Sequence, residues 1–159
     1  MINPTAKKVQ QALAALGCEC RVIEFSESTR TAQEAAERAG CELGQIVKSL
    51  IFRGQKSGKA VLVLASGSNR VDEARLGELA GEPIGRADAD FVRSVTGYAI
   101  GGVPPIGYTQ PVDTYLDEDL LTYPTVWAAA GTPNAIFEIG PRELLRITQA
   151  KVSPVKLIR

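Results

Sequence analysis

The 159-residue chain contains no histidine, and this absence removes the commonest general base near neutral pH. A serine nucleophile activated by histidine and a cysteine–histidine pair are both excluded. Any catalytic base must therefore be a carboxylate, a lysine with a shifted pKa, or a group of the substrate itself. Cysteine is also scarce, with only Cys18, Cys20 and Cys41. We expect three free thiols and no zinc site, because the number is odd and Cys18 and Cys20 lack a second pair of ligands.

The sequence also lacks an uninterrupted apolar run of the roughly 18 residues that a transmembrane helix needs. Its first twenty residues suit an amphipathic helix rather than a signal segment, so we expect an unexported protein of the cytoplasm. A chain of 159 residues with 45% apolar residues can bury one core of ordinary size. Residues 1–159 are therefore interpreted as one domain.

The 18 basic and 18 acidic residues balance, but they are unevenly distributed. Residues 46–70 contain five basic residues and no acid, and residues 142–159 contain five basic residues and only Glu143. Such segregation is compatible with a local site for a phosphate backbone, although solvated surface lysines are the commoner explanation. The neutral total argues against a broad grip on a nucleic acid.

Hydrophobic periodicity predicts helices interspersed with strands. Residues 4–16 carry apolar residues at helical spacing, and the capping box of Thr31 and Glu34 begins a second helix. The segment AVLVLA at 60–65 is apolar on both faces, which indicates an interior strand. Other strands are expected at 19–25, 46–52, 126–130 and 135–139, and other helices from Asp72 to Gly81, over 87–95 and from Pro141. About six strands, several joined as hairpins, predict a mixed sheet.

Lys48 is unusual because strand alternation places it on the same side as Leu50 and Phe52. One explanation is a ligand anion at the end of a pocket. The other is that the lysine stem lies along the core while the ammonium reaches water. The position alone does not decide between them.

Two further segments indicate a shaped site. In Gly101-Gly102-Val103-Pro104-Pro105-Ile106-Gly107, glycines allow close approach to a ligand and prolines stiffen the path. Fixed backbone N–H groups in such a loop can bind an oxyanion, although an ordinary stiff turn is the commoner explanation. Residues 128–131, Ala-Ala-Ala-Gly, leave volume unfilled beside a sheet, where either a helix or a small ligand packs.

These segments resemble the YbaK/EbsC family of aminoacyl-tRNA deacylases, which is related to the editing domain of bacterial prolyl-tRNA synthetases. The matching segments, in order, are TAQEAAERAGCELGQIVKSLIF, SGSNRVDEARL, TGYAIGGVPPIG, VWAAAG and AIFEIGPREL. The resemblance implies an α+β fold in which a mostly antiparallel mixed sheet or barrel of about six to seven strands is surrounded by helices. It implies hydrolysis without metal or cofactor, with a hydroxyl of the terminal ribose helping to activate water.

The family also implies the roles of particular residues. The lysine corresponding to Lys48 lies at the editing pocket and assists binding of the aminoacylated 3′ end. We expect Gly101 and Gly102 to stabilise the carbonyl oxygen through their N–H groups. The expected substrate-binding residues are Phe25, Thr31, Val103, Pro104, Pro105, Ala129, Ala130 and Gly131.

Ala129 stands where the family typically has serine, so the amino acid that is removed stays open. The expected substrate is mischarged tRNA carrying a small amino acid, with tRNA(Pro) as the acceptor. The expected partners are the tRNA acceptor end and prolyl-tRNA synthetase. Two alternatives remain: a noncatalytic module that binds an aminoacylated end or a free amino acid, and a protein-interaction adaptor with an exposed apolar patch.

Overall fold

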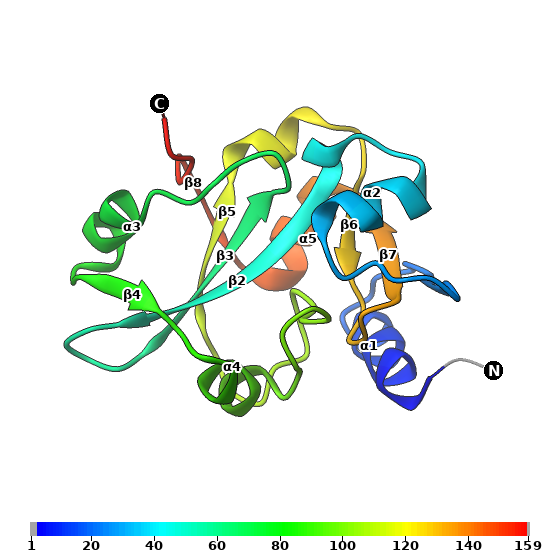
Figure 1. Cartoon of the computed structure of the whole chain (residues 1–159), viewed down its shortest axis with the longest axis horizontal. Helices are drawn as coiled ribbons and strands as arrows, with labels where there is room; N and C mark the ends of the chain where they lie inside the picture. The colour runs from blue at the N-terminus through cyan, green and yellow to red at the C-terminus, as the bar shows by residue number, and fades with distance from the viewer. Residues whose placement is uncertain (1–2, 159) are drawn as a thin grey trace.

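The computed structural model describes residues 3–158. In these residues an eight-stranded sheet is accompanied by five α-helices and two short 3-10 helices (Figure 1). The helices are α1 (Pro4–Ala15), α2 (Ala32–Ala39), η1 (Leu43–Gln45), α3 (Glu73–Ala80), α4 (Ala89–Thr96), η2 (Glu118–Thr122) and α5 (Pro141–Thr148). The strands are β1 (Val22–Glu24), β2 (Ile46–Gly54), β3 (Ala60–Ser66), β4 (Ile84–Arg86), β5 (Asp113–Asp117), β6 (Val126–Ala129), β7 (Ala135–Ile139) and β8 (Lys151–Ser153).

The strand order is β1-β7-β6-β2-β3-β5-β8, with β4 paired to β2. Four strand pairs are antiparallel, whereas β2 with β6, β3 with β5 and β5 with β8 are parallel. The predicted α+β fold with a mixed sheet is confirmed. Five of the eight strands fall at the expected ranges, whereas β4, β5 and β8 were not expected. Strands β4 and β8 have three residues each, too few for alternation to show in the sequence, and β5 begins and ends with an aspartate.

The hairpin of β2 and β3 forms the middle of the sheet. Leu62 and Leu64 of β3 pack into the main core on one face, and Val61 and Val63 pack into a second apolar cluster on the other. The interior strand predicted from AVLVLA is therefore confirmed. Burial of both faces explains why this segment is apolar throughout.

Strand β2 is only partly paired on the edge that faces away from β3. On that edge β6 pairs with Ile46 and Val47, and β4 pairs with the segment from Phe52 to Gly54. Among the described residues, no strand pairs with residues 48–51 on this side. The sheet therefore opens beside Lys48, and the candidate site lies at this opening.

The predicted helix starts are confirmed by their caps. Asn3 caps α1 by accepting from the Thr5 N–H at 2.7 Å. Thr31 accepts from the Glu34 N–H at 3.1 Å, and the Glu34 carboxylate accepts from the Thr31 N–H at 3.1 Å, which is the predicted capping box. No helix within residues 3–158 has the length and apolar character to span a bilayer.

The expectation of three free thiols is wrong for two of them. Cys18 and Cys20 are joined as a disulfide, and Cys41 is free. Their Cα atoms lie 5.5 Å apart, within the range that a disulfide spans. Counting cysteines missed the pair because it considered a framework between distant segments, whereas this bridge links residues that are two positions apart.

Candidate active site

A cavity of about 820 Å³ opens where β2 lacks a strand partner. Its lining includes residues of β2 from both faces of the strand, the start of α2, the segment around Gly101, and the end of β6. A volume of this size falls in the range of small-molecule sites. It can accommodate the end of a large substrate but not its body.

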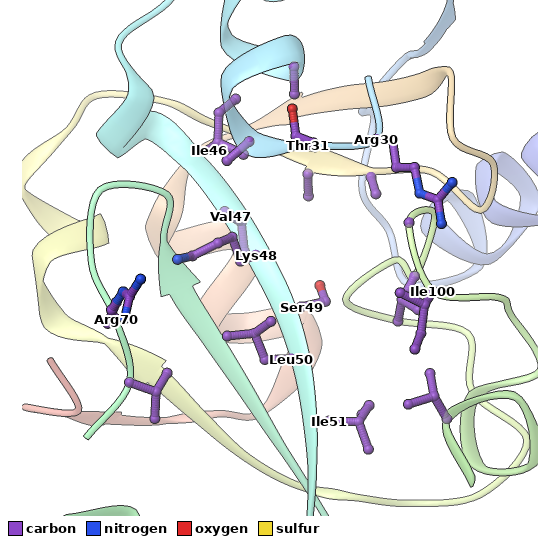
Figure 2. A pocket seen from close by; sticks show the side chains of 18 of the residues that line it. Arg30, Thr31, Ile46, Val47, Lys48, Ser49, Leu50, Ile51, Arg70 and Ile100 are labelled. Atoms are coloured by element: carbon purple, nitrogen blue, oxygen red, sulfur yellow. The ribbon is translucent and has the colours of Figure 1, made fainter. Parts of the chain in front are cut away.

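Lys48 extends from β2 along one side of this cavity. Figure 2 shows Lys48 and Leu50 on one side of the strand, with Arg70 beyond Lys48, and Ser49 and Ile51 on the other side. The Lys48 side chain is half-buried, and its Nζ donates to the backbone oxygen of Asn69. The predicted alternation along β2 is confirmed: Lys48 lies on the same side of the strand as Leu50, which packs against the second apolar cluster, and Lys48 also lines the cavity.

The environment of Lys48 lowers the pKa of its ammonium. Burial is the largest cause, the positive charge of Arg70 acts in the same direction, and the negative charge of Asp117 raises the pKa in opposition. Lys48 forms no salt bridge with a carboxylate of residues 3–158, so its positive charge can act on a ligand anion. This arrangement fits the ligand-anion interpretation of Lys48.

The lining of the cavity is positively charged. Four cations, those of Lys48, Arg30, Arg70 and Arg86, line it together with one carboxylate, that of Glu73. The three arginines form no salt bridge with any residue from 3 to 158. An excess of positive charge around a cavity attracts an anionic ligand. Sequence analysis missed the arginines because they come from three separate loops and strands.

Ser49 is a second lining residue that sequence analysis missed. Its hydroxyl oxygen is buried and has no hydrogen-bond partner within residues 3–158. Ser49 lies on the opposite side of β2 from Lys48 and faces the Ile100 side of the cavity (Figure 2). A buried hydroxyl without a hydrogen-bond partner costs free energy. A polar ligand group that forms a hydrogen bond with Ser49 would remove this cost.

The glycine-proline loop lines the cavity on the side of β2 that Ser49 faces, whereas Lys48 extends from the other side of the strand (Figure 2). Gly101 and Val103 line the cavity, and Gly101 has a positive φ of 101°. Its N–H donates to no acceptor in the part of the chain that the structure describes. Pro104 and Pro105 of the same loop are buried, and the Pro104 oxygen accepts from the Tyr108 hydroxyl at 2.7 Å.

Gly102 differs from its expected role. Its N–H already donates to the Ala99 oxygen at 3.2 Å, and its oxygen accepts from the Gly131 N–H at 2.8 Å. A Cβ at this position would lie 2.8 Å from the backbone of Thr132. The structure therefore explains Gly102 by the close approach of two backbone segments, and its N–H is not a free donor.

Residues 128–131 were expected to leave room for either a helix or a small ligand, and the structure places some of them at the cavity and others against the core and α1. Ala128 and Ala129 line the cavity, whereas Ala130 is fully buried in the main core. A Cβ on Gly131 would lie 3.0 Å from Val9 of α1, so this glycine allows a helix to pack closely. Ala128 and Ala129 are thus the residues through which this segment shapes the cavity.

The two remaining predicted residues lie at the side formed by α2. Thr31 lines the cavity and caps α2. Phe25 is outside the lining and packs against the cluster that contains Ala35, Ile46 and Ile136, all of which line the cavity. Phe25 therefore packs against residues that line the cavity without lining it itself.

The fold is that of an aminoacyl-tRNA editing domain. The chain belongs to this family, whose model matches residues 26–147. The resemblance to the YbaK/EbsC family is thereby confirmed.

Several relatives are similar over most of the chain. "Uncharacterized protein YwhH" of Bacillus subtilis (strain 168) is 35% identical over 131 residues, which cover 82% of this chain and 83% of the relative. "Putative Cys-tRNA(Pro)/Cys-tRNA(Cys) deacylase EbsC" of Enterococcus faecalis (strain ATCC 700802 / V583) is 30% identical over 132 residues, which cover 82% and 80% of the two chains. A solved structure described as "a putative trans-editing enzyme for prolyl tRNA synthetase" is 51% identical, with a TM-score of 0.94 over 99% of this chain and 100% of the other. Together these similarities support a deacylase role.

Proposed function

We propose that this protein is a trans-editing deacylase that hydrolyses the ester between a small amino acid and the 3′ end of tRNA(Pro). The observation that carries this proposal is a cavity lined both by Lys48 of β2 and by Gly101 of the loop. Editing-domain membership supports the reaction class. The printed names of the EbsC relative and the prolyl-tRNA trans-editing structure support the choice of tRNA.

In this proposal the cations of the cavity bind the terminal nucleotide. The ammonium of Lys48 and the arginines around the cavity attract the phosphates of the acceptor end. The N–H of Gly101 donates to the ester carbonyl oxygen as negative charge develops on it, which lowers the barrier to attack by water. The terminal ribose hydroxyl assists that water. Holding an already reactive ester in place then supplies most of the catalysis.

The amino acid is proposed to lie beside Ala129. The cavity is apolar here, because Ala128, Ile136 and Trp127 also line it. The volume of about 820 Å³ is large enough to hold a terminal adenosine together with the amino acid. Among the small amino acids, the assay below distinguishes alanine, serine, threonine and cysteine.

A panel of tRNA(Pro) charged with each of these amino acids or with proline tests the proposal. We expect the protein to deacylate at least one mischarged tRNA and to spare prolyl-tRNA(Pro). Lys48→Ala should lose this activity while remaining folded, and Lys56→Ala, which removes an exposed lysine of the β2–β3 loop, serves as the matched control. Binding of the charged end without hydrolysis above background would overturn the proposal and select the noncatalytic module.

We also propose that specificity is aided by a complex with prolyl-tRNA synthetase. Net charge is zero, so the protein itself holds little of the tRNA body. Co-purification of the two proteins at low salt is the expected result. Failure to co-purify under those conditions would contradict the partnership but not the deacylase activity.

A further inference from the structure

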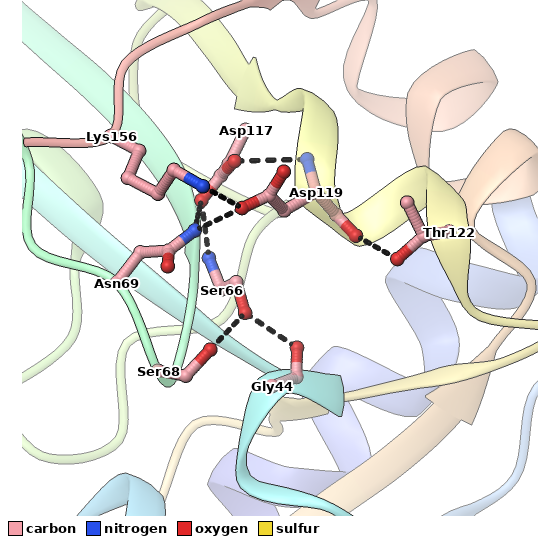
Figure 3. Close-up of polar contacts among 8 residues, drawn as sticks. All are labelled: Gly44, Ser66, Ser68, Asn69, Asp117, Asp119, Thr122 and Lys156. Carbon is pink, nitrogen blue, oxygen red and sulfur yellow. Dashed lines mark hydrogen bonds and ion pairs between the residues drawn. The ribbon is translucent and has the colours of Figure 1, made fainter. Parts of the chain in front are cut away.

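Asp117, at the end of β5, is the only fully buried charged side chain within residues 3–158. A buried carboxylate is costly unless donors surround it. Asp117 accepts from the Ser66 N–H at 3.0 Å, from the Asn69 side-chain amide at 2.8 Å and from the Asp119 N–H at 3.0 Å (Figure 3). These three donors come from the last residue of β3, the segment that follows it and η2, so Asp117 fixes that segment and η2 to the end of the sheet.

Asn69 connects this carboxylate to the cavity. Its side-chain amide donates to Asp117 and, at 2.8 Å, to Asp119, which also forms a salt bridge of 3.1 Å with Lys156. The backbone oxygen of the same residue accepts from Lys48 Nζ. Asn69 is thus held by two carboxylates through its side chain and contacts the ammonium of Lys48 through its backbone.

The lysine needs such a contact to adopt one position. The β2–β3 ladder fixes the Lys48 backbone opposite Ala65, but four rotatable bonds separate that backbone from the ammonium. Ordering a lysine side chain costs conformational entropy. A carbonyl held in place by a buried carboxylate can offset part of this cost before substrate arrives.

We propose that Asp117 is a positioning residue of the editing site, which acts through Asn69 to hold the ammonium of Lys48 at the cavity. This inference rests on the proposed function of that cavity. Asp117 itself is separated from the cavity by the segment that carries Asn69, and it touches no substrate. Its contribution is to preorganise the cation that the substrate meets.

The electrostatics of the cluster supply a readout specific to this role. The negative charge of Asp117 raises the pKa of Lys48 against the lowering caused by burial. Arg70 is the other charged group that acts on Lys48; Asp119 and Lys156 belong to the Asn69 cluster, and Glu73, Arg86 and Arg30 line the same cavity. Removing the charge of Asp117 should therefore move the titration of Lys48 to lower pH, which a purely structural role would not do.

Asp117→Asn keeps the size of the side chain but presents an amide where Ser66 and Asn69 donate. We expect its single-turnover deacylation rate to fall by about 10²-fold, as is typical of a misplaced catalytic group. The ¹³C signal of the Lys48 ε-carbon, assigned by its absence from Lys48→Arg, should titrate at lower pH than in the wild type. Thr122→Val is the matched control. It removes a hydrogen bond to the Asp119 oxygen in the same cluster without reaching Asn69, so it should change neither quantity.

Asn69→Ala keeps the Asp117 charge and removes the side-chain amide that holds the Asn69 backbone oxygen in place. It therefore tests the inference if Asp117→Asn does not fold. A folded Asn69→Ala protein should also lose rate. Wild-type rates in a folded Asn69→Ala protein, or wild-type rates with an unchanged Lys48 titration in a folded Asp117→Asn protein, would overturn the inference. If the wild-type protein deacylates nothing, the proposed function fails, but the titration still shows whether Asp117 controls Lys48.

Discussion

Replacing Gly102 by alanine is expected to lower the stability of the protein through a clash with backbone. The new Cβ would lie 2.8 Å from the N and C atoms of Thr132 and 2.9 Å from the C atom of Gly131. Backbone atoms cannot change rotamer as a side chain can, so the loop at Gly102 and the segment of Gly131 and Thr132 must move apart. Overpacking of this kind typically costs about 1–3 kcal/mol. For a chain of this size, each kcal/mol lowers Tm by roughly 2–4 °C, which gives an expected fall of roughly 2–12 °C.

Thermal and urea unfolding followed by circular dichroism measure this loss. Gly140→Ser is the control, because no atom lies within 4 Å of a Cβ at that position and serine suits the helix cap that Gly140 provides. We expect the control to match or exceed wild-type stability. A Gly102→Ala protein that unfolds at the wild-type temperature would refute the close backbone approach as the reason for glycine.

Three further predictions concern the cavity and its supports. Ala129→Leu should reduce deacylation at least tenfold with little change in Tm, because the larger side chain extends into the cavity; retained single-turnover rates would place the amino acid elsewhere. Thr31→Ala should cost about 0.5–2 kcal/mol of unfolding free energy by removing the α2 cap, and Thr31→Ser should restore it, as urea unfolding would show. Because burial lowers the pKa of Lys48, the ammonium is lost as pH rises through a value below the ordinary 10.5, so activity should fall on the alkaline side. Rates corrected for spontaneous ester hydrolysis test this; the same profile in Lys48→Arg would exclude Lys48 as the titrating group.

Sequence patterns predicted the elements whose signals are local. The capping box of Thr31 and Glu34 and the alternation along β2 depend on neighbouring residues, and both are present in the structure. Lys48 was noticeable because a cation interrupts an apolar face. That anomaly follows from the residue order alone, without knowledge of what packs nearby.

Features that depend on distant residues could not be predicted in this way. Asp117 and Asn69 lie 48 positions apart, and nothing in either segment indicates their hydrogen bond. The same is true of Gly102, whose need for glycine comes from the backbone near Thr132. Strand β4 was missed because its pairing with β2, rather than its own sequence, makes it a strand.

The most direct test of the account is the single-turnover rate at which the protein releases a small amino acid from mischarged tRNA(Pro), measured for the wild type and Lys48→Ala. The account predicts hydrolysis by the wild type and a rate about 10²- to 10³-fold lower in the variant, with an unchanged circular dichroism spectrum. A folded Lys48→Ala protein that hydrolyses the ester at the wild-type rate would contradict it.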